Sequence, residues 1–322
     1  MATGAEIIIQ NGKTLYEPVV HEDIQWSTER FGEPGKLTFK VVYDSKLKIE
    51  EGNAVRFKWN GHKIFFGFIF TIKIDKVGKI ATITAYDQLR YFKNKDTYVY
   101  ANKTAGAVIK MIAKDFAMQC GSIADTKYKI PSRVEDNKTL FDIIQNALDA
   151  TLENKKQMYV MYDDFGKITL KSLEDMKTNI LIDKDTAISY DYSSTIDSNT
   201  YNKVKLVFDN DKTKKRDVYI AQSSKNMNKW GVLQLYETLQ EGENGKAKAD
   251  ALLKLYNSKT KKLTIKTLGS VKVRAGSMVV VMLSLGDKKL CNYMLVESCK
   301  HTFKLNEHTM ELHLRGGEFT GE

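Results

Sequence analysis

Two stretches of this sequence carry the same β-strand pattern, and a repeat of this kind restricts the fold more than any other feature. Residues 52–87 and 276–315 each open on a Gly that precedes an apolar strand, Gly52 in the first and Gly276 in the second. In both, another Gly follows within about ten residues, and two longer strands come after it with similar spacing. The pattern predicts two copies of one β-domain. The alternative, two unrelated meanders that look alike, stays open at this point.

The strands of the first stretch show which residues should be buried. Lys36–Tyr43 alternates apolar and polar residues, as is typical of a strand with one buried face. In a longer strand, the even-numbered apolar residues from Ile64 to Ile74 share one face, which we expect to be the core face. Phe65 and Ile69 lie on the opposite face. Apolar residues on both faces predict that another element or a partner protein covers this strand.

The periodicity changes between residues 88 and 175. Thr104 precedes a helical pattern of apolar residues, and Thr139 followed by Asp142 resembles a capping box at the start of a second helix. A hairpin with its turn at residues 163–166 comes next. These signals predict a compact α/β insertion.

From about residue 180 the strand patterns return, interrupted by one helical stretch at 245–257. The chain as a whole is therefore expected to be α+β and mainly β, with two similar antiparallel β-barrel domains and an α/β insertion between them. The expected boundaries are 1–88 for the first barrel, 89–178 for the insertion and 179–322 for the second barrel, which contains the helix 245–257.

The charge and the cysteines narrow the class of protein. The net charge is +10, and most of the excess lies in residues 176–322, with 24 Lys and Arg against 17 Asp and Glu. Such a basic segment either binds nucleic acid or forms solvated strand faces. Three cysteines without CxxC spacing favour folding in a reducing cytoplasm over a disulfide scaffold or a zinc ribbon. The longest apolar run, Ile64–Phe70, is too short to span a bilayer, and no secretory leader is recognised.

Motifs for catalysis or metal binding are not found. The sequence contains no phosphate-binding Gly-rich loop, nucleophile elbow, HExxH or EF-hand pattern. His301, His308 and His313 lie close together, but a hairpin turn at Asn306-Glu307 would place His301 opposite Leu312 and His313 on the other face, so that the three could not bind one ion. We therefore expect no catalytic, cofactor-binding or metal-binding residues.

Two further pairs of residues carry groups that could take part in chemistry, a pair of carboxylates and a pair of thiols. Asp163 and Asp164 are adjacent carboxylates in a turn, where neighbouring side chains point apart. Cys291 and Cys299 are evenly spaced, which predicts two small buried thiols on one face unless a bulge intervenes.

The order of these features resembles the baseplate hub proteins of contractile-tailed phages and related particles, the late control D and prophage tail hub family. The resemblance is carried by Gly61–Asp87, Thr104–Ile109 and Tyr293–His301 with its closing hairpin, and it covers most of the chain. It is weak in residues 180–240.

The resemblance implies a homotrimer in which two barrels per chain form a pseudo-sixfold ring between a hexameric tail tube and a trimeric spike. It also implies contacts with other baseplate proteins, and DNA or a tape-measure protein passing through the channel. Such hubs are parts of a virion or a tailocin assembled in the bacterial cytoplasm, they do not insert into membranes, and they carry no active site or cofactor.

Two other functions stay open from the sequence. A peptidoglycan hydrolase of the tail tip would need an acidic cleft in the insertion, with Asp163, Asp164 or Glu153 as its carboxylates. A nucleic-acid binder would use the basic C-terminal half and would lose affinity steeply with salt.

Overall fold

The computed structural model describes residues 4–44, 46–75, 77–198, 200–210, 214–239, 244–285, 288–305 and 307–316. The fold is mainly β and divides into two compact bodies. The main body contains residues 1–191 and 264–322, and the small body contains residues 192–263. In the described part of the chain, no helix has the length and apolar character needed to cross a membrane.

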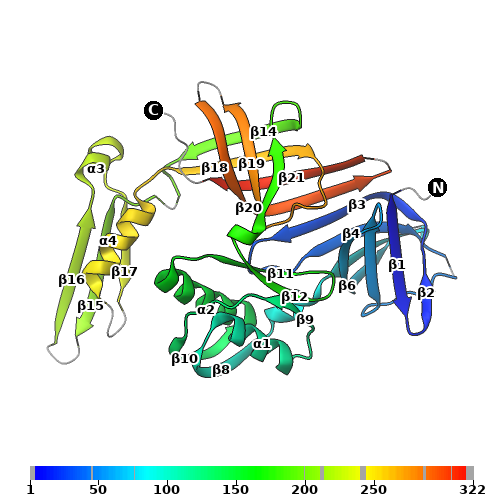
Figure 1. The fold of residues 1–322 in the computed structure, drawn as a ribbon, viewed down its shortest axis with the longest axis horizontal. Coiled ribbons are helices and arrows are strands. Elements are labelled where there is room, and N and C mark those ends of the chain that lie inside the picture. The colour runs from blue at the N-terminus through cyan, green and yellow to red at the C-terminus, as the bar shows by residue number, and fades with distance from the viewer. Residues whose placement is uncertain are drawn as a thin grey trace. The chain divides into compact units, whose positions relative to one another are not determined.

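The main body consists of two β-units with an insertion between them (Figure 1). The first β-unit comprises β1 (Ala5–Asn11), β2 (Thr14–Tyr16), β3 (Val20–Glu29), β4 (Lys36–Val42), β5 (Ala54–Trp59), β6 (His62–Ile74) and β7 (Ile80–Tyr86). The second β-unit comprises β13 (Lys177–Ile182), β14 (Ala187–Thr195), β18 (Thr260–Leu268), β19 (Met278–Leu285), β20 (Lys288–Lys304) and β21 (Glu307–Gly316).

The two β-units have the same strand order. The first runs β3-β4-β7-β6-β5-β1, with β2 added beyond β1, and the second runs β14-β18-β21-β20-β19-β13. If β2 is left out of the count, here and below, the second strand along the chain starts the order in each unit, followed by the third, sixth, fifth, fourth and first. One difference is that β13 pairs parallel with β19, whereas β1 pairs antiparallel with β5. Both units belong to one 13-stranded sheet, whose hydrogen-bonded path stays open in the described residues rather than closing into two barrels.

The turn that opens β5 is repeated in front of β19. Gly52 and Gly276 both have a φ of 88°, a region that side chains with a Cβ rarely occupy. The Gly52 N–H donates to the Ile69 carbonyl at 2.8 Å, and the Gly276 N–H donates to the Val296 carbonyl at 2.7 Å. The repeat that the two glycines predict therefore extends to their hydrogen-bond partners.

A β-bulge follows in both units at the equivalent place. The pairing of β6 with β7 shifts register between Ile69 and Thr71, and the pairing of β20 with β21 shifts between Val296 and Ser298. Because Ile69 and Val296 are already matched by the turn, Thr71 and Ser298 are equivalent residues. Two unrelated meanders would have no reason to share an order of six strands, a left-handed Gly and a bulge.

Pairing between β20 and β3 joins the two β-units. Six residues of β20, Ser298–Phe303, pair antiparallel with Ile24–Glu29 of β3. In Figure 1 the orange-red β20 runs beside the dark-blue β3. Phe303 is 1% exposed and belongs to the core of the first β-unit, where its ring centroid lies 5.0 Å from those of Phe57 and Trp59. The second unit thus completes the core of the first.

The expected core face of β6 is wrong between Phe65 and Phe70, although Ile64 and Ile72 of the expected face do contribute to the core. Phe65 and Ile69 are 2% and 1% exposed and lie in the core of the first β-unit, whereas Phe66 and Phe70 are only partly buried. The reason is that the opposite face is also covered: Phe66 contacts Phe165 of the insertion at 6.0 Å between ring centroids. The predicted second covering element exists, but the two faces were exchanged.

The insertion follows the expected helix signals. Thr104 Oγ1 accepts from the Ala107 N–H at 3.3 Å, and Thr139 Oγ1 accepts from the Asp142 N–H at 3.1 Å, so that both predicted caps begin a helix. The segment comprises η1 (Gln88–Lys93), β8 (Lys95–Lys103), α1 (Ala105–Asp115), β9 (Cys120–Ile123), β10 (Ile130–Thr139), α2 (Leu140–Lys155), β11 (Tyr159–Asp163), β12 (Ile168–Ser172) and η2 (Glu174–Met176).

The small body has its own sheet and core. Helix α4 lies on a three-stranded sheet of order β16-β15-β17, and Val204, Leu206 and Ala249 are buried between them. This body holds 14 Lys and Arg against 8 Asp and Glu, which accounts for much of the net charge. Its elements are β15 (Lys203–Asn210), β16 (Lys215–Gln222), α3 (Ser224–Trp230), β17 (Gln234–Thr238) and α4 (Gly245–Tyr256).

Candidate functional site

A cluster of polar side chains lies where the two β-units and the insertion meet in the main body. Asp87 follows β7, Asp163 ends β11 and Arg274 precedes β19. Each of these residues stands at a strand end, where the backbone turns and its side chain can reach neighbouring segments. We call this set, with His301 and His308 described below, the polar junction.

Asp87 ties the loop after β3 to the start of the insertion. Its Oδ2 accepts from the Gly35 N–H at 2.9 Å, and its Oδ1 accepts from the Leu89 N–H at 3.0 Å. Burial raises the pKa of Asp87 well above its usual value, and the neighbouring Asp163 carboxylate acts in the same direction. The two N–H donors and the Arg274 cation favour the ionised form and oppose this shift.

Asp163 connects the insertion back to the same place. It accepts from Gln88 Nε2 at 2.8 Å and from the Gly166 N–H at 2.7 Å. Burial raises its pKa as well. Asp164 is exposed, so the two adjacent carboxylates face different surroundings, as the turn predicts.

Arg274 is held between two aromatic rings. Its guanidinium carbon lies 4.1 Å from the centroid of the Tyr162 ring and 5.5 Å from that of Trp26. Its positive charge lowers the pKa of both buried carboxylates. Arg274 therefore contacts rings from β3 and β11 and interacts electrostatically with two carboxylates that backbone N–H groups fix in place. Such an arrangement can hold three segments together, and we infer that this is what the cluster does.

His301 and His308 form a hydrogen-bonded pair beside Arg274. His301 Nε2 lies 2.9 Å from the Val273 carbonyl oxygen, which can only accept, so this nitrogen carries the proton. His301 Nδ1 then accepts from His308 Nε2 at 2.8 Å. Burial lowers the pKa of His301 to about 3, with a further effect of His308, and burial lowers the pKa of His308 to about 4. Both imidazoles are therefore neutral in the folded protein at ordinary pH.

His313 lies on the opposite face from His301, as expected, whereas the contact between His301 and His308 was not predicted. The last hairpin pairs Lys304 with Glu307, so the chain reverses one residue earlier than expected and His301 lies opposite Met310. Asn306, the expected turn residue, is outside the described residues. His313 is exposed, on the other face. Among the residues that the structure describes, no three His, Cys, Asp or Glu are grouped so that they could hold a metal ion.

The prediction of two buried thiols on one face is also wrong. Cys299 is buried, but Cys291 is exposed. The bulge between Val296 and Ser298 lies between the two cysteines and changes the face to which later side chains point.

Acid should weaken the protein through His301. In the unfolded chain a histidine takes up a proton below about pH 6.5, whereas folded His301 does so only near pH 3. Between these values the unfolded state binds more protons, so stability should fall as the pH falls, by up to about 1.4 kcal/mol per pH unit. The buried carboxylates act oppositely, because their raised pKa values favour the folded state on acidification.

A matched comparison separates these effects. Urea unfolding at pH 7 and pH 5 should show a shallower pH dependence for His301→Gln than for the unmodified chain, since the carboxylates contribute equally to both. The exposed His313→Gln should leave the pH dependence unchanged. Equal slopes for all three proteins would contradict the assignment of a neutral, buried His301.

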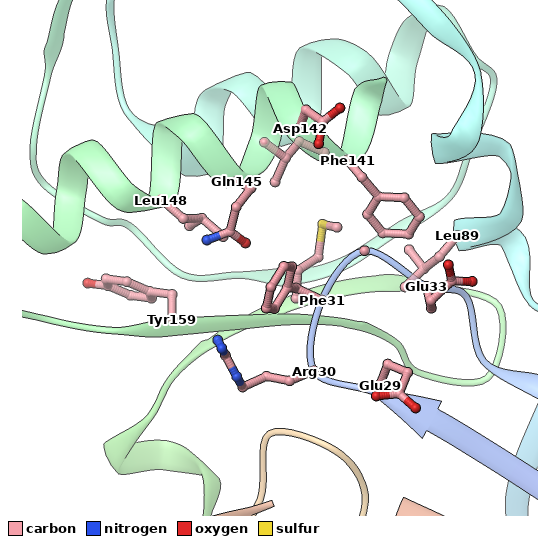
Figure 2. Close-up of a pocket in the computed structure, with 13 residues that line it drawn as sticks. Glu29, Arg30, Phe31, Glu33, Leu89, Phe141, Asp142, Gln145, Leu148 and Tyr159 are labelled. Carbon is pink, nitrogen blue, oxygen red and sulfur yellow. The ribbon is translucent and has the colours of Figure 1, made fainter. Parts of the chain in front are cut away.

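A small pocket lies between the loop after β3 and helix α2 (Figure 2). Its volume is about 90 Å³, whereas pockets for organic ligands usually have about 300–1,000 Å³. None of Asp163, Asp164 and Glu153 lines it. Figure 2 shows an aromatic and aliphatic lining with acidic residues around it, among them Phe31, Phe141, Leu148, Tyr159, Glu29, Glu33 and Asp142.

The carboxylates required by the hydrolase alternative are not brought together at a cleft. Asp163 is buried and bonded to Gln88, whereas Asp164 in the adjacent turn and Glu153 on α2 are exposed. Asp87, Arg274 and Trp26, which the structure does bring together, were not identified from the sequence as a site. For Arg274 the repeat itself was a signal, because this residue stands two positions before Gly276.

Comparison with solved structures identifies the fold. It is shared with the 43 kDa tail protein of prophage MuSo2 from Shewanella oneidensis, at a TM-score of 0.73 and 12% identity over 96% of this chain and 98% of that one. Prophage tail protein gp18 from Listeria monocytogenes EGD-e matches at a TM-score of 0.61 and 14% identity, over 97% and 94% of the two chains. The fold is therefore the one found in these two phage tail proteins.

The chain belongs to the YQBQ-like family, whose model matches residues 24–315. It is 31% identical to the protein YqbQ of Bacillus subtilis (strain 168) over 309 residues, which is 93% of each chain. It is 30% identical over 310 residues, again 93% of each, to XkdQ, a protein of the phage-like element PBSX of the same strain. The resemblance to tail hub proteins seen in the sequence is thereby confirmed at the level of family and fold.

Proposed function

We propose that this chain is the structural baseplate hub of a contractile phage tail or tailocin. Three copies form a ring of six similar β-domains, which joins the hexameric tail tube to the trimeric spike. Each β-unit acts as one tube-like β-domain, within the boundaries 1–88 and 179–322, and residues 89–178 form the insertion between them.

The observation that carries this proposal is the internal repeat. Both β-units share the strand order, the Gly turn and the bulge, so one chain offers two nearly equivalent surfaces. A hexameric tube needs six equivalent contacts and a trimeric spike needs three, and a trimer of duplicated chains supplies both symmetries.

The proposed partners are the tail tube protein, the spike or cell-puncturing protein and other baseplate proteins, with DNA or a tape-measure protein passing through the channel. The chain acts through its surfaces and catalyses no reaction, and it resides in the particle after assembly in the bacterial cytoplasm. The polar junction fits this role, because its charged groups fix internal segments against one another.

Multi-angle light scattering of the purified chain, alone and mixed with the tube and spike proteins of the same particle, tests the proposal. The expected mass is about 110 kDa, three times the 36.7 kDa of one chain, either for the free protein or for the copies bound to one spike trimer. A chain that stays monomeric and binds neither protein would refute the hub assignment.

A further inference from the structure

The contact that joins the two β-units has a counterpart that a single chain cannot make. Within the chain, β20, the fifth strand of the second unit, pairs with β3, the second strand of the first unit. By the shared strand order, β6 is the equivalent of β20 and β14 is the equivalent of β3. The reciprocal contact would pair β14 with β6, but these strands lie far apart in the order of the same sheet.

The edge of β6 that would take part is free. β5 pairs with β6 only as far as Phe68, and beyond the bulge Thr71–Ile74 pair with β7 on one side. In the described residues the other side of this segment has no strand. The equivalent segment of β20, which starts at Ser298, pairs with β21 on one side and with β3 on the other.

The apolar side chain at the end of this segment is exposed although its equivalent is buried. Counting from the matched pair Thr71 and Ser298, Ile74 is the equivalent of His301. Ile74 is 45% exposed, whereas His301 is fully buried under β3. An isoleucine at the end of a free strand edge is a site where another strand is expected to add.

Strand β14 is the matching free strand. It lies at the end of the sheet and, among the described strands, pairs with β18 alone. Ile188 and Tyr190 on it are 54% and 46% exposed. In its equivalent, β3, Ile24 and Trp26 are 3% and 4% exposed, because β20 and the elements beside it cover them. A long strand with large apolar side chains is seldom left open in a soluble protein.

We infer that β14 of one copy pairs antiparallel with Thr71–Ile74 of β6 in the next copy, so that the contact between chains repeats the contact within the chain. The inference rests on the proposed trimer and specifies its interface. Contacts within chains and contacts between chains then alternate around the ring. If each contact rotates one β-unit relative to the next by a similar angle, six contacts close a ring of three copies.

The two kinds of contact are similar but not identical. The turn before Gly52 repeats that before Gly276: the Glu50 N–H donates to Asn53 Oδ1 at 3.0 Å, and the Arg274 N–H donates to Ser277 Oγ at 3.1 Å. At the inferred contact between chains, Glu50 therefore occupies the position that Arg274 has in the polar junction. The opposite charge disfavours exchange of one kind of contact for the other.

Disulfide cross-linking tests the inferred pairing. A chain carrying Lys73→Cys in β6 and Ser189→Cys in β14, with the exposed Cys120 and Cys291 replaced by serine, is assembled as in the light-scattering experiment and oxidised with oxidised glutathione. Because cross-linking needs Cβ atoms about 3.5–4.5 Å apart, Ile188→Cys and Asp191→Cys replace Ser189→Cys in two parallel chains to cover the possible registers. At least one of the three should give covalent dimers and trimers on a non-reducing denaturing gel.

The controls separate failure of this inference from failure of the hub assignment. Each single-cysteine chain should stay monomeric on the gel, as should Lys63→Cys combined with Ser189→Cys, because Lys63 lies where β6 already pairs with β5. A trimer by light scattering that cross-links with none of the three pairs, or equally with Lys63→Cys, would overturn the strand pairing and leave the hub standing. Absence of any three-copy assembly would overturn both.

Discussion

Gly276→Ala should lower the free energy of unfolding much more than Gly52→Ala, although the two glycines occupy equivalent turns. Both have a φ of 88°, so an alanine at either place should lose about 1–2 kcal/mol to backbone strain. Only at Gly276 would the added Cβ also meet a neighbour, at 2.3 Å from Val160 Cγ1, whereas at Gly52 nothing lies within 4 Å. This overlap should add about 1–3 kcal/mol.

The comparison tests the close contact between the second β-unit and the insertion, since Val160 belongs to β11. Urea unfolding followed by tryptophan fluorescence should place the midpoints in the order unmodified chain, Gly52→Ala, Gly276→Ala. Equal losses in the two variants would mean that β11 does not lie against the turn as described. The near-symmetry of the turns makes Gly52→Ala a control for strain alone.

Phe303→Ala should cost about 3–5 kcal/mol, because it removes a fully buried aromatic ring and leaves a cavity. The ring belongs to β20 of the second β-unit but contacts Phe57 and Trp59 in the core of the first. The loss should therefore affect the folding of both units together. Phe31→Ala, at a ring that is 55% exposed in the loop after β3, should change stability by less than about 0.5 kcal/mol.

The measurement is again urea unfolding, with circular dichroism and tryptophan fluorescence recorded on the same samples. In a Trp230→Phe background the fluorescence comes from Trp26 and Trp59 of the first β-unit, and circular dichroism reports on all strands. In Phe303→Ala both signals should shift to lower urea. A shift in circular dichroism without one in fluorescence would show that the first β-unit folds without the second, although Phe303 of the second unit lies in its core.

The parts of the fold that could be predicted from sequence depend on local chemistry. Thr104 and Thr139 were recognisable as caps because a hydroxyl three residues before a free N–H can satisfy it in any context. Gly52 and Gly276 were recognisable because a turn with positive φ selects glycine. The repeat of strands after each glycine led directly to the duplicated strand order and to the hub hypothesis.

The errors have a common physical origin in the period of the β-strand. Alternation divides a strand into two faces but does not say which face is buried, so Phe65 and Phe66 were assigned to the wrong sides of β6. A single bulge or a turn displaced by one residue changes which side chains meet. This is why Cys291 and Cys299 were placed on one face and why the contact between His301 and His308 was not predicted.

The candidate site could not be predicted from the sequence, for a different reason. Asp87, Asp163 and Arg274 come from segments separated by many residues, and nothing in the neighbours of each indicates that the three meet. The raised pKa values of Asp87 and Asp163 arise chiefly from burial, which exists only after the chain has folded.

The sequence by itself thus determined the β-rich class, the repeat, the helical insertion and its caps, since each depends on residues close together in the chain. Tertiary structure alone decided that β20 pairs with β3 and that Phe303 lies in the core of the other β-unit. It also decided that the residues of the polar junction meet where the two β-units and the insertion come together. Pairing between distant strands and the burial of charges depend on which surfaces meet, and a local pattern carries no information about that.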